Sequence, residues 1–235
     1  MHFLCQRMNR GEVYENFLYV AALAAGCCIS VPLKINESNL KGHCLLFGEL
    51  DVLTNTVLAG NHGYCTFTFY SSLTNAALAA LLGFFKWCCS VDTDSPRVVY
   101  FKFTTCILSA IAWINCLVCT IFIVIGFTEW CSSVTNNGNV ESCQNAEKWD
   151  WTQYTPADID GSKFYTYLFM AEVASFCVVV IWFIIVILSG RNFKQRLLQA
   201  RAAQYYITDG RMVYPVPIQE IPVYEIKSEQ GSRYL

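Results

Sequence analysis

Two cysteines, Cys116 and Cys119, form a C-x-x-C pair in the middle of a long uncharged segment. Such a pair can cycle between dithiol and disulfide when one thiol is activated by a nearby base or a helix N-terminus. Residues 103–128, which contain the pair, include neither histidine nor lysine. A membrane thiol oxidoreductase is therefore the weakest of three functional hypotheses, and small apolar packing residues are the simpler interpretation of this pair.

Four other cysteines lie in or beside two polar stretches of the chain: Cys44, Cys65, Cys131 and Cys143. In an oxidising compartment four cysteines form two disulfides, for which three connectivities exist. We favour Cys44–Cys65 and Cys131–Cys143, because each pair closes its own loop. Asn137-Gly138 lies inside the second loop and is a strong hairpin-turn signal.

Three further residues are candidates for covalent modification. Asn36 begins the glycosylation sequon Asn-Glu-Ser, although it lies only a few residues from an apolar segment, where the membrane crowds the acceptor. Cys88 and Cys89 follow an apolar segment directly. Juxtamembrane cysteines of this kind are palmitoylation candidates, and two reduced structural thiols are the alternative.

Three polar residues interrupt the apolar segments. Asn75 and Asn115 are expected to form hydrogen bonds between helices. Glu172 lies inside the membrane if its helix enters the bilayer at Phe164. It lies at the membrane interface if the helix enters the bilayer only at Val173. The interfacial position is favoured, because the uncharged residues 173–190 already span about 27 Å. An acid at this depth is a candidate for ion or partner contact.

The elements that position these residues follow from the distribution of charge. The chain has 235 residues, of which 54% are hydrophobic and only 14% are charged. Four nearly uncharged segments of 17 or more residues are long enough to cross a bilayer as helices: 17–33, 63–87, 103–128 and 164–190. The small residues Ala21, Ala24, Ala25 and Gly26 in the first segment permit close helix packing. The predicted fold is an all-α, four-helix transmembrane bundle.

The basic residues predict the orientation of this bundle. Nine lysines and arginines flank one set of helix ends, and only four flank the other. Basic residues prefer the cytosolic side, so both termini are predicted to be cytosolic and the two disulfide-braced loops to lie outside. The outer stretches carry nine acids, which indicates a solvated acidic face or, alternatively, a vestibule that attracts cations.

The predicted organisation has three parts. Residues 1–16 form a cytosolic N-terminus, residues 17–190 the transmembrane domain, and residues 191–235 a cytosolic tail. The tail begins with a basic amphipathic helix and becomes proline-rich and disordered. We expect no cofactor, no metal and no nucleic-acid partner, and we expect the lipid bilayer and a lateral protein partner or a second copy.

Several short strings resemble the transmembrane protein 179 family, in order and at similar spacing between Phe17 and Gly190. They are Val31-Pro-Leu33, Lys41-Gly-His-Cys-Leu-Leu-Phe47, Gly126-Phe-Thr-Glu-Trp-Cys131, Ser142-Cys143, Phe164-Tyr165 and Ala171-Glu172. The resemblance implies a four-pass membrane protein and carries no established activity. Claudins fit less well, because their first loop ends in two nearby cysteines.

The leading functional hypothesis is a non-enzymatic tetraspan protein that acts through lateral partners, as an accessory subunit, trafficking factor or organiser. A pore-forming oligomer, with the two cysteines per loop of pannexin-like channels, is the alternative, ahead of the thiol oxidoreductase. The oxidised loops favour the plasma membrane or an endosomal membrane.

Overall fold

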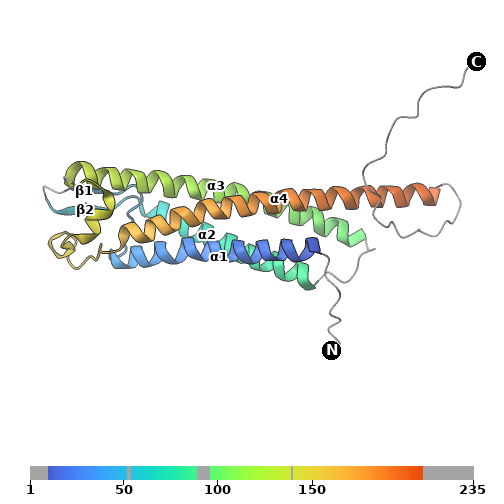
Figure 1. Cartoon of the computed structure of the whole chain (residues 1–235), viewed down its shortest axis with the longest axis horizontal. Helices are drawn as coiled ribbons and strands as arrows, with labels where there is room; N and C mark the ends of the chain where they lie inside the picture. The colour runs from blue at the N-terminus through green and yellow to red at the C-terminus, as the bar shows by residue number, and fades with distance from the viewer. Residues whose placement is uncertain (1–9, 52–53, 89–95, 139, 209–235) are drawn as a thin grey trace, which may run out of the picture. The chain divides into compact units, whose positions relative to one another are not determined.

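The computed structural model describes residues 10–51, 54–88, 96–138 and 140–208. Its elements are the helices α1 (Arg10–Asn39), α2 (His62–Cys88), α3 (Pro96–Gly138) and α4 (Phe164–Thr208), the strands β1 (Glu49–Asp51) and β2 (Thr56–Leu58), and the 3-10 helices η1 (Cys143–Lys148) and η2 (Trp151–Gln153) (Figure 1). In the described part of the chain, four helices are long and apolar enough to cross a membrane. The expectation of an all-α protein with four membrane-crossing helices is confirmed.

Each helix is longer than the uncharged segment that predicts it, because polar residues at the segment ends continue the helix. One prediction is wrong: Asn137-Gly138 does not form a hairpin turn, since α3 runs through Gly138. An Asn-Gly pair signals a hairpin only between alternating strand residues, and here it follows a helix. The proline-rich part of the tail lies outside the described residues, and residues 197–235 form a separate unit.

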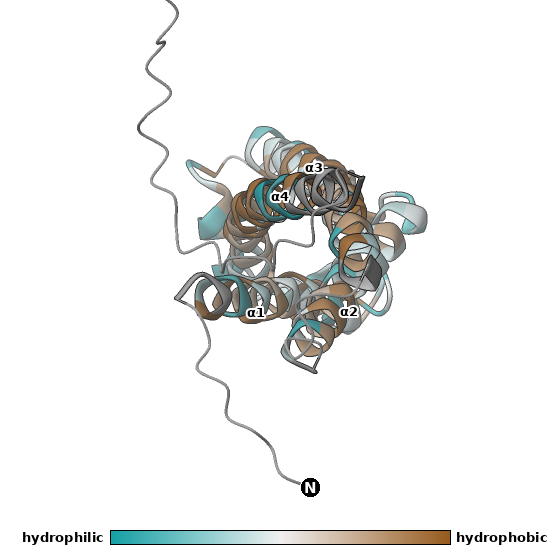
Figure 2. Ribbon diagram, turned by 90° about the vertical axis from the view of Figure 1, so that its right-hand side faces the viewer, coloured by the Kyte–Doolittle hydropathy of each residue, from teal (hydrophilic) through white to brown (hydrophobic). Residues whose placement is uncertain are grey.

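The four helices pack around a core of buried apolar side chains in residues 10–196. Helices α1 and α2 approach closely at Gly26, where an added Cβ would lie 2.9 Å from the Cβ of Ala76. Elsewhere large aromatic side chains fill the space between helices. Trp182 of α4 is completely buried and meets Tyr19 of α1 edge to face. Hydrophobic residues lie on every helix of the bundle (Figure 2).

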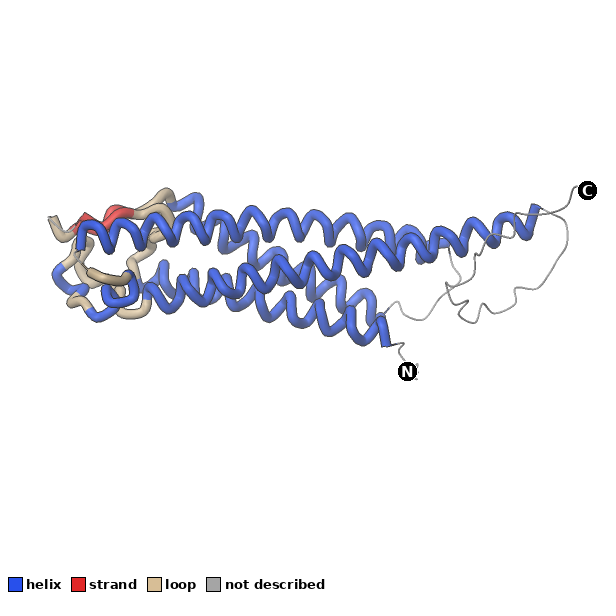
Figure 3. The backbone as a smooth tube through the Cα atoms, turned by 45° about the horizontal axis from the view of Figure 1, so that its top comes forward, coloured by secondary structure: helices blue, strands red, loops and turns tan. Residues whose placement is uncertain are grey.

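The loops that the structure describes gather at one end of the bundle, which we call the loop end (Figure 3). There β1 and β2 form an antiparallel pair in which Leu50 lies opposite Val57. The chain after η2 joins this hairpin, because the Val57 amide donates to the carbonyl of Thr155 at 2.9 Å. The sequence did not predict these strands, since each has only three residues and too few positions to reveal alternation.

The helix starts at the loop end are held by polar side chains. The amide of Gly63 donates to the side-chain oxygen of Asn61, which caps α2 at 2.9 Å. At the start of α4, the amide of Thr166 donates to the carboxylate of Glu147 in η1 at 2.7 Å. A negative charge at a helix N-terminus is favourable, so Glu147 ties the second loop to α4.

Candidate functional site

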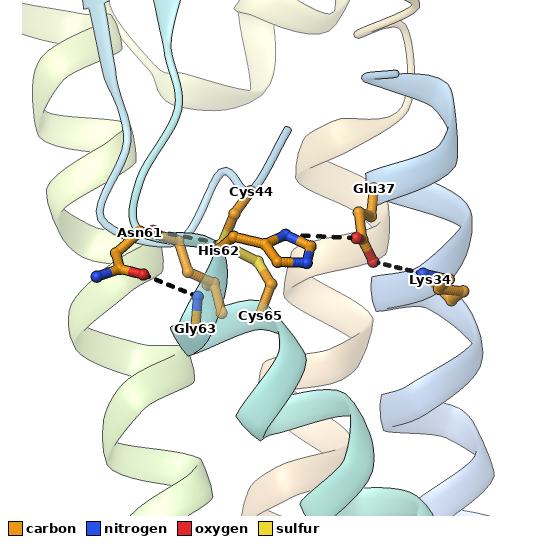
Figure 4. Close-up of polar contacts among 8 residues, drawn as sticks. Lys34, Glu37, Cys44, Asn61, His62, Gly63 and Cys65 are labelled. Carbon is orange, nitrogen blue, oxygen red and sulfur yellow. Dashed lines mark hydrogen bonds and ion pairs between the residues drawn. A yellow bond between two sulfur atoms is a disulfide. The ribbon is translucent and has the colours of Figure 1, made fainter. Parts of the chain in front are cut away.

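Two disulfides brace the loop end. Cys44 pairs with Cys65 and Cys131 pairs with Cys143, and these are the pairs favoured from the sequence. The first disulfide joins the first loop to the start of α2, where Gly63 and Asn61 lie (Figure 4). The second joins the outer part of α3 to the start of η1. Both loops are therefore held against the helices.

The first loop closes the mouth of the helix bundle. Leu46 is completely buried, and Phe47 packs between Tyr64 of α2 and Phe122 of α3, with ring centroids 4.6 and 6.4 Å away. The amide of Phe47 donates to the carbonyl of Gly126 at 3.3 Å. These residues end the string Lys41–Phe47, one of the strings that resemble the transmembrane protein 179 family, so its leucines and phenylalanine seal the bundle.

The Asn36 sequon lies near the end of α1, and its asparagine side chain is only 4% exposed. Its neighbour Glu37 forms an ion pair with Lys34 at 2.9 Å, and its carboxylate lies 3.8 Å from Nδ1 of His62 (Figure 4). These contacts join α1 to the start of α2. The structure does not test whether this candidate sequon is glycosylated, but the folded conformation leaves little access to the Asn36 amide.

The C-x-x-C pair lies inside the bundle. Cys116 and Cys119 are both free thiols, 2% and 3% exposed. The side-chain amide of Asn75 donates to Sγ of Cys116 at 3.2 Å, and Ser72 lies 3.5 Å from Sγ of Cys119. Asn75 thus forms an interhelical bond from α2 to α3. The adjacent cavity is about 10 Å³, which is room for roughly one water molecule.

Asn115 lies elsewhere on α3 and differs from Asn75. Its side chain is half-buried, and no hydrogen bond to it occurs among the residues that the structure describes. The predicted interhelical hydrogen bond is therefore not made within the described part of this chain.

A charged cluster at the end of the bundle opposite the loops was not predicted. Glu15 of α1 pairs with Lys86 of α2 and also accepts a hydrogen bond from the side-chain amide of Asn192 of α4. Both charged side chains are about nine-tenths buried, with 11% and 12% exposed. The sequence did not single out Glu15 or Lys86 as site residues. Their opposite charges at the predicted cytosolic ends of consecutive helices were the signal that could have paired them.

Glu172 borders an open groove of about 530 Å³ between the loop end of α3, the start of η1 and α4. One wall is the face of α3 from Phe127 to Thr135, and both cysteines of the Cys131–Cys143 disulfide line the groove. Tyr165 of α4 lines the groove and packs on Phe127, with ring centroids 5.5 Å apart. Glu172 is half-buried, and its carboxylate has no hydrogen bond or ion pair among the described residues.

Two acids of the second loop have lowered pKa values. The hydroxyl of Thr152 donates to Asp150 at 2.6 Å and is the largest cause of the lowered pKa of that carboxyl. The amide of Ser162 donates to Asp160 at 2.9 Å and lowers the pKa of Asp160 in the same way. These carboxylates stabilise loop turns as anions.

The two palmitoylation candidates are Cys88 and Cys89. Cys88 is the last residue of α2, and Cys89 lies outside the described residues. Palmitoylation of either stays a prediction. Among the described residues, no group of three or more histidine, cysteine and acidic side chains is placed to hold a metal ion.

Comparison with known proteins identifies relatives along most of the chain. Transmembrane protein 179B of Danio rerio is 24% identical over 186 residues, covering 77% of this chain and 83% of the relative. The proteins of the same name from Mus musculus and Homo sapiens are each 27% identical over 184 residues, covering 77% of this chain and 82% of the relative. No solved structure matches the chain.

A family model, described as the transmembrane protein 179/179B claudin domain, matches residues 12–208. The sequence argument set claudins aside because Cys44 and Cys65 lack the context of the claudin first loop, and the match to a claudin domain corrects it. The model covers the four helices and both disulfide-braced loops together. The strings that pointed to the transmembrane protein 179 family lie within it, and the chain therefore belongs to the transmembrane protein 179/179B family of claudin-like, multi-pass membrane proteins.

Proposed function

We propose that this protein acts through lateral contacts with other membrane proteins, as an accessory subunit, trafficking factor or organiser. The observation that carries the proposal is the position of Asn115. It lies in the middle of the third apolar helix, half-buried, and its amide has no hydrogen-bond partner in the described part of the chain.

An amide in this position is costly in lipid. An unsatisfied polar group in the hydrocarbon core costs several kcal/mol. A hydrogen bond between membrane helices recovers about 0.6–2 kcal/mol. Because α1, α2 and α4 do not supply this bond within the described residues, a helix of another molecule is the natural source.

The closed interior of the bundle supports action through its outer surface. Leu46 is fully buried at the loop end, and the central cavity beside Cys116 is about 10 Å³. A volume of this size holds about one water molecule and not a hydrated ion. The thiols of Cys116 and Cys119 face hydroxyl and amide groups and not a base, which disfavours redox chemistry there.

The proposed orientation places both termini in the cytosol and the loop end outside the cell or in an endosomal lumen. The excess of basic residues at the opposite end favours this orientation. The two disulfides favour an oxidising compartment for the loop end. Partners that recognise the loops would then be outer or lumenal regions of membrane proteins.

A pore-forming oligomer is the second candidate, and Asn115 also favours it. The same half-buried amide would then lie at an interface between copies of this chain, around an axis outside the bundle. The acidic loop end would attract cations toward such an axis.

The test is mild detergent extraction of the tagged protein and of its Asn115→Leu variant from native cells, followed by sizing and mass spectrometry. We expect a stoichiometric membrane-protein partner with the wild type and at least a threefold loss with Asn115→Leu. The matched control is Ile111→Leu, an exposed apolar position one turn away. A homogeneous homo-oligomer would favour the pore, and a monomer without a partner would overturn both proposals.

A further inference from the structure

We propose that the groove beside Glu172 binds the segment of a partner membrane protein that leaves the bilayer, with a lysine or arginine of that segment facing Glu172. This inference rests on the proposed lateral function and names the surface and the chemistry of one contact. Its structural basis is a half-buried carboxylate that borders an open groove of about 530 Å³ and has no hydrogen bond or ion pair among the described residues.

The first step is the depth of Glu172 in the membrane. Asn192 is twenty residues further along α4, in the charged cluster at the other end of the bundle. Twenty helical residues span about 30 Å, which equals the thickness of the hydrocarbon core. Glu172 therefore lies at the boundary between hydrocarbon and headgroups on the loop side.

The second step is the charge of the groove. Glu172 is the only acidic side chain among the lining residues, and none of the lining residues is basic. Hydroxyl and amide groups line much of the rest, including those of Ser132, Thr135 and Gln144. A half-buried carboxylate without a partner favours a cationic ligand, and the neutral polar walls favour the backbone of a peptide.

The third step is the length of the groove. The hydroxyl of Thr120 on α3 donates to the carbonyl of Ser175 on α4 at 3.3 Å, which sets the register of these helices. Glu172, three residues before Ser175, then lies near Ile123 of α3. The α3 residues that line the groove run outward from Phe127 to Thr135, over which the helix rises about 12 Å.

This length favours a polypeptide over a lipid. The headgroup layer is only about 5–8 Å thick on each side of the bilayer, so the outer part of the groove lies beyond the reach of a headgroup. A free Ca²⁺ ion would need six or more oxygen ligands, usually with several carboxylates, and the groove has one carboxylate.

The surface below Glu172 suits a continuing helix of the same partner. Val173, Phe176 and Val180 form an exposed apolar face of α4 on the hydrocarbon side of Glu172. A partner helix could pack on this face and place its boundary lysine or arginine beside Glu172. Its first residues outside the membrane would then enter the groove.

The test uses purified full-length protein in phosphatidylcholine vesicles with synthetic single-pass leucine-alanine helices as probes. One probe has a lysine at the boundary on the loop side, one has leucine there, and one has glutamate. Binding is measured by energy transfer between labelled protein and labelled probe. We expect the lysine probe to bind at least tenfold more tightly than the leucine probe.

Variants locate the interaction. Glu172→Gln should abolish the preference for lysine, and Glu172→Lys should reverse it in favour of the glutamate probe. Glu129→Gln is the matched control, because Glu129 is an exposed acid of α3 that does not line the groove. A lysine placed at the opposite end of the probe should bind no better than leucine. Retained disulfides and an unchanged elution profile show that each variant is folded.

Two outcomes of the vesicle experiment would overturn the inference. One is equal binding of the lysine and leucine probes to the wild type. The other is a bound lipid, detected by mass spectrometry of the intact protein, that Glu172→Gln releases while the probes show no charge preference. In native cells, a stoichiometric partner that Glu172→Gln still retains would refute this contact and leave the proposed function standing. The absence of any partner for the wild type would refute the proposed function itself.

Discussion

Glu15 of α1 and Lys86 of α2 form an ion pair at the end of the bundle away from the loops, and Asn192 of α4 donates to the same carboxylate. One carboxylate thus ties three helices together where they leave the hydrocarbon. Both charged side chains are largely buried and have lost most of their contact with water, so each is stabilised by the opposite charge of the other.

Removing only one charge of this pair should destabilise the protein. Lys86→Met leaves Glu15 buried without its cation, and we expect a loss of about 3 kcal/mol in the free energy of unfolding. The double variant Glu15→Gln with Lys86→Met should recover at least half of that loss. Both the loss in the single variant and the recovery in the double variant are measured by unfolding in detergent micelles. Lys148→Met, at an exposed lysine of η1, is the control, and an equal loss there would contradict the argument.

Close packing of α1 on α2 at Gly26 predicts a second effect. Gly26→Ala brings a Cβ to 2.9 Å from that of Ala76, so the two helices must move apart, at a cost of about 1–3 kcal/mol. Gly190→Ala is the matched control, since an added Cβ there meets nothing within 4 Å and should stabilise the helix slightly. The measurement is the free energy of unfolding of each variant. Equal effects of the two substitutions on it would refute a packing role for Gly26.

Acid should weaken the second loop through Asp160. Its pKa is lowered in the folded state, chiefly by the hydrogen bond from the Ser162 amide, so its contribution is present above the ordinary value of 3.8 and is lost as the pH falls through the folded pKa. We expect the unfolding temperature to decline below pH 3.8 less steeply in Asp160→Asn than in the wild type.

The control for this pH effect is Asp158→Asn. The carboxyl of Asp158 has no hydrogen-bond partner among the described residues, and asparagine tolerates its positive φ of 62°. This variant should follow the wild-type decline. Identical profiles for the wild type and Asp160→Asn would show that Asp160 does not contribute.

The Asn36 sequon gives a prediction about glycosylation. Because the Asn36 side chain is 4% exposed, we expect no change in the electrophoretic mobility of the wild type after glycosidase treatment. Gly138→Thr creates a sequon at Asn136, an exposed residue near the end of α3. The electrophoretic mobility of this variant should change after glycosidase treatment if the loop end faces the lumen or the outside. A change in the mobility of the wild type that is absent from Asn36→Gln would contradict the first expectation. An unchanged mobility of Gly138→Thr would count against the predicted orientation.

The sequence alone determined the four crossings and favoured the two disulfide pairings that the structure has. A helix in lipid must be apolar over about 20 residues, and this requirement is visible locally in the absence of charge. Cys131 and Cys143 are close in the chain, as are Cys44 and Cys65, so loop closure alone favoured their pairing.

Only the tertiary structure decided which polar residues meet. Asn75 and Asn115 look alike in the sequence, yet Asn75 faces Cys116 inside the bundle and Asn115 has no described partner. Which face of each helix points inward depends on packing across all four helices, since apolar residues surround them on every side. The contact of Glu15 with Lys86 and the groove beside Glu172 likewise depend on the register between helices, which charge and hydropathy along the chain do not encode.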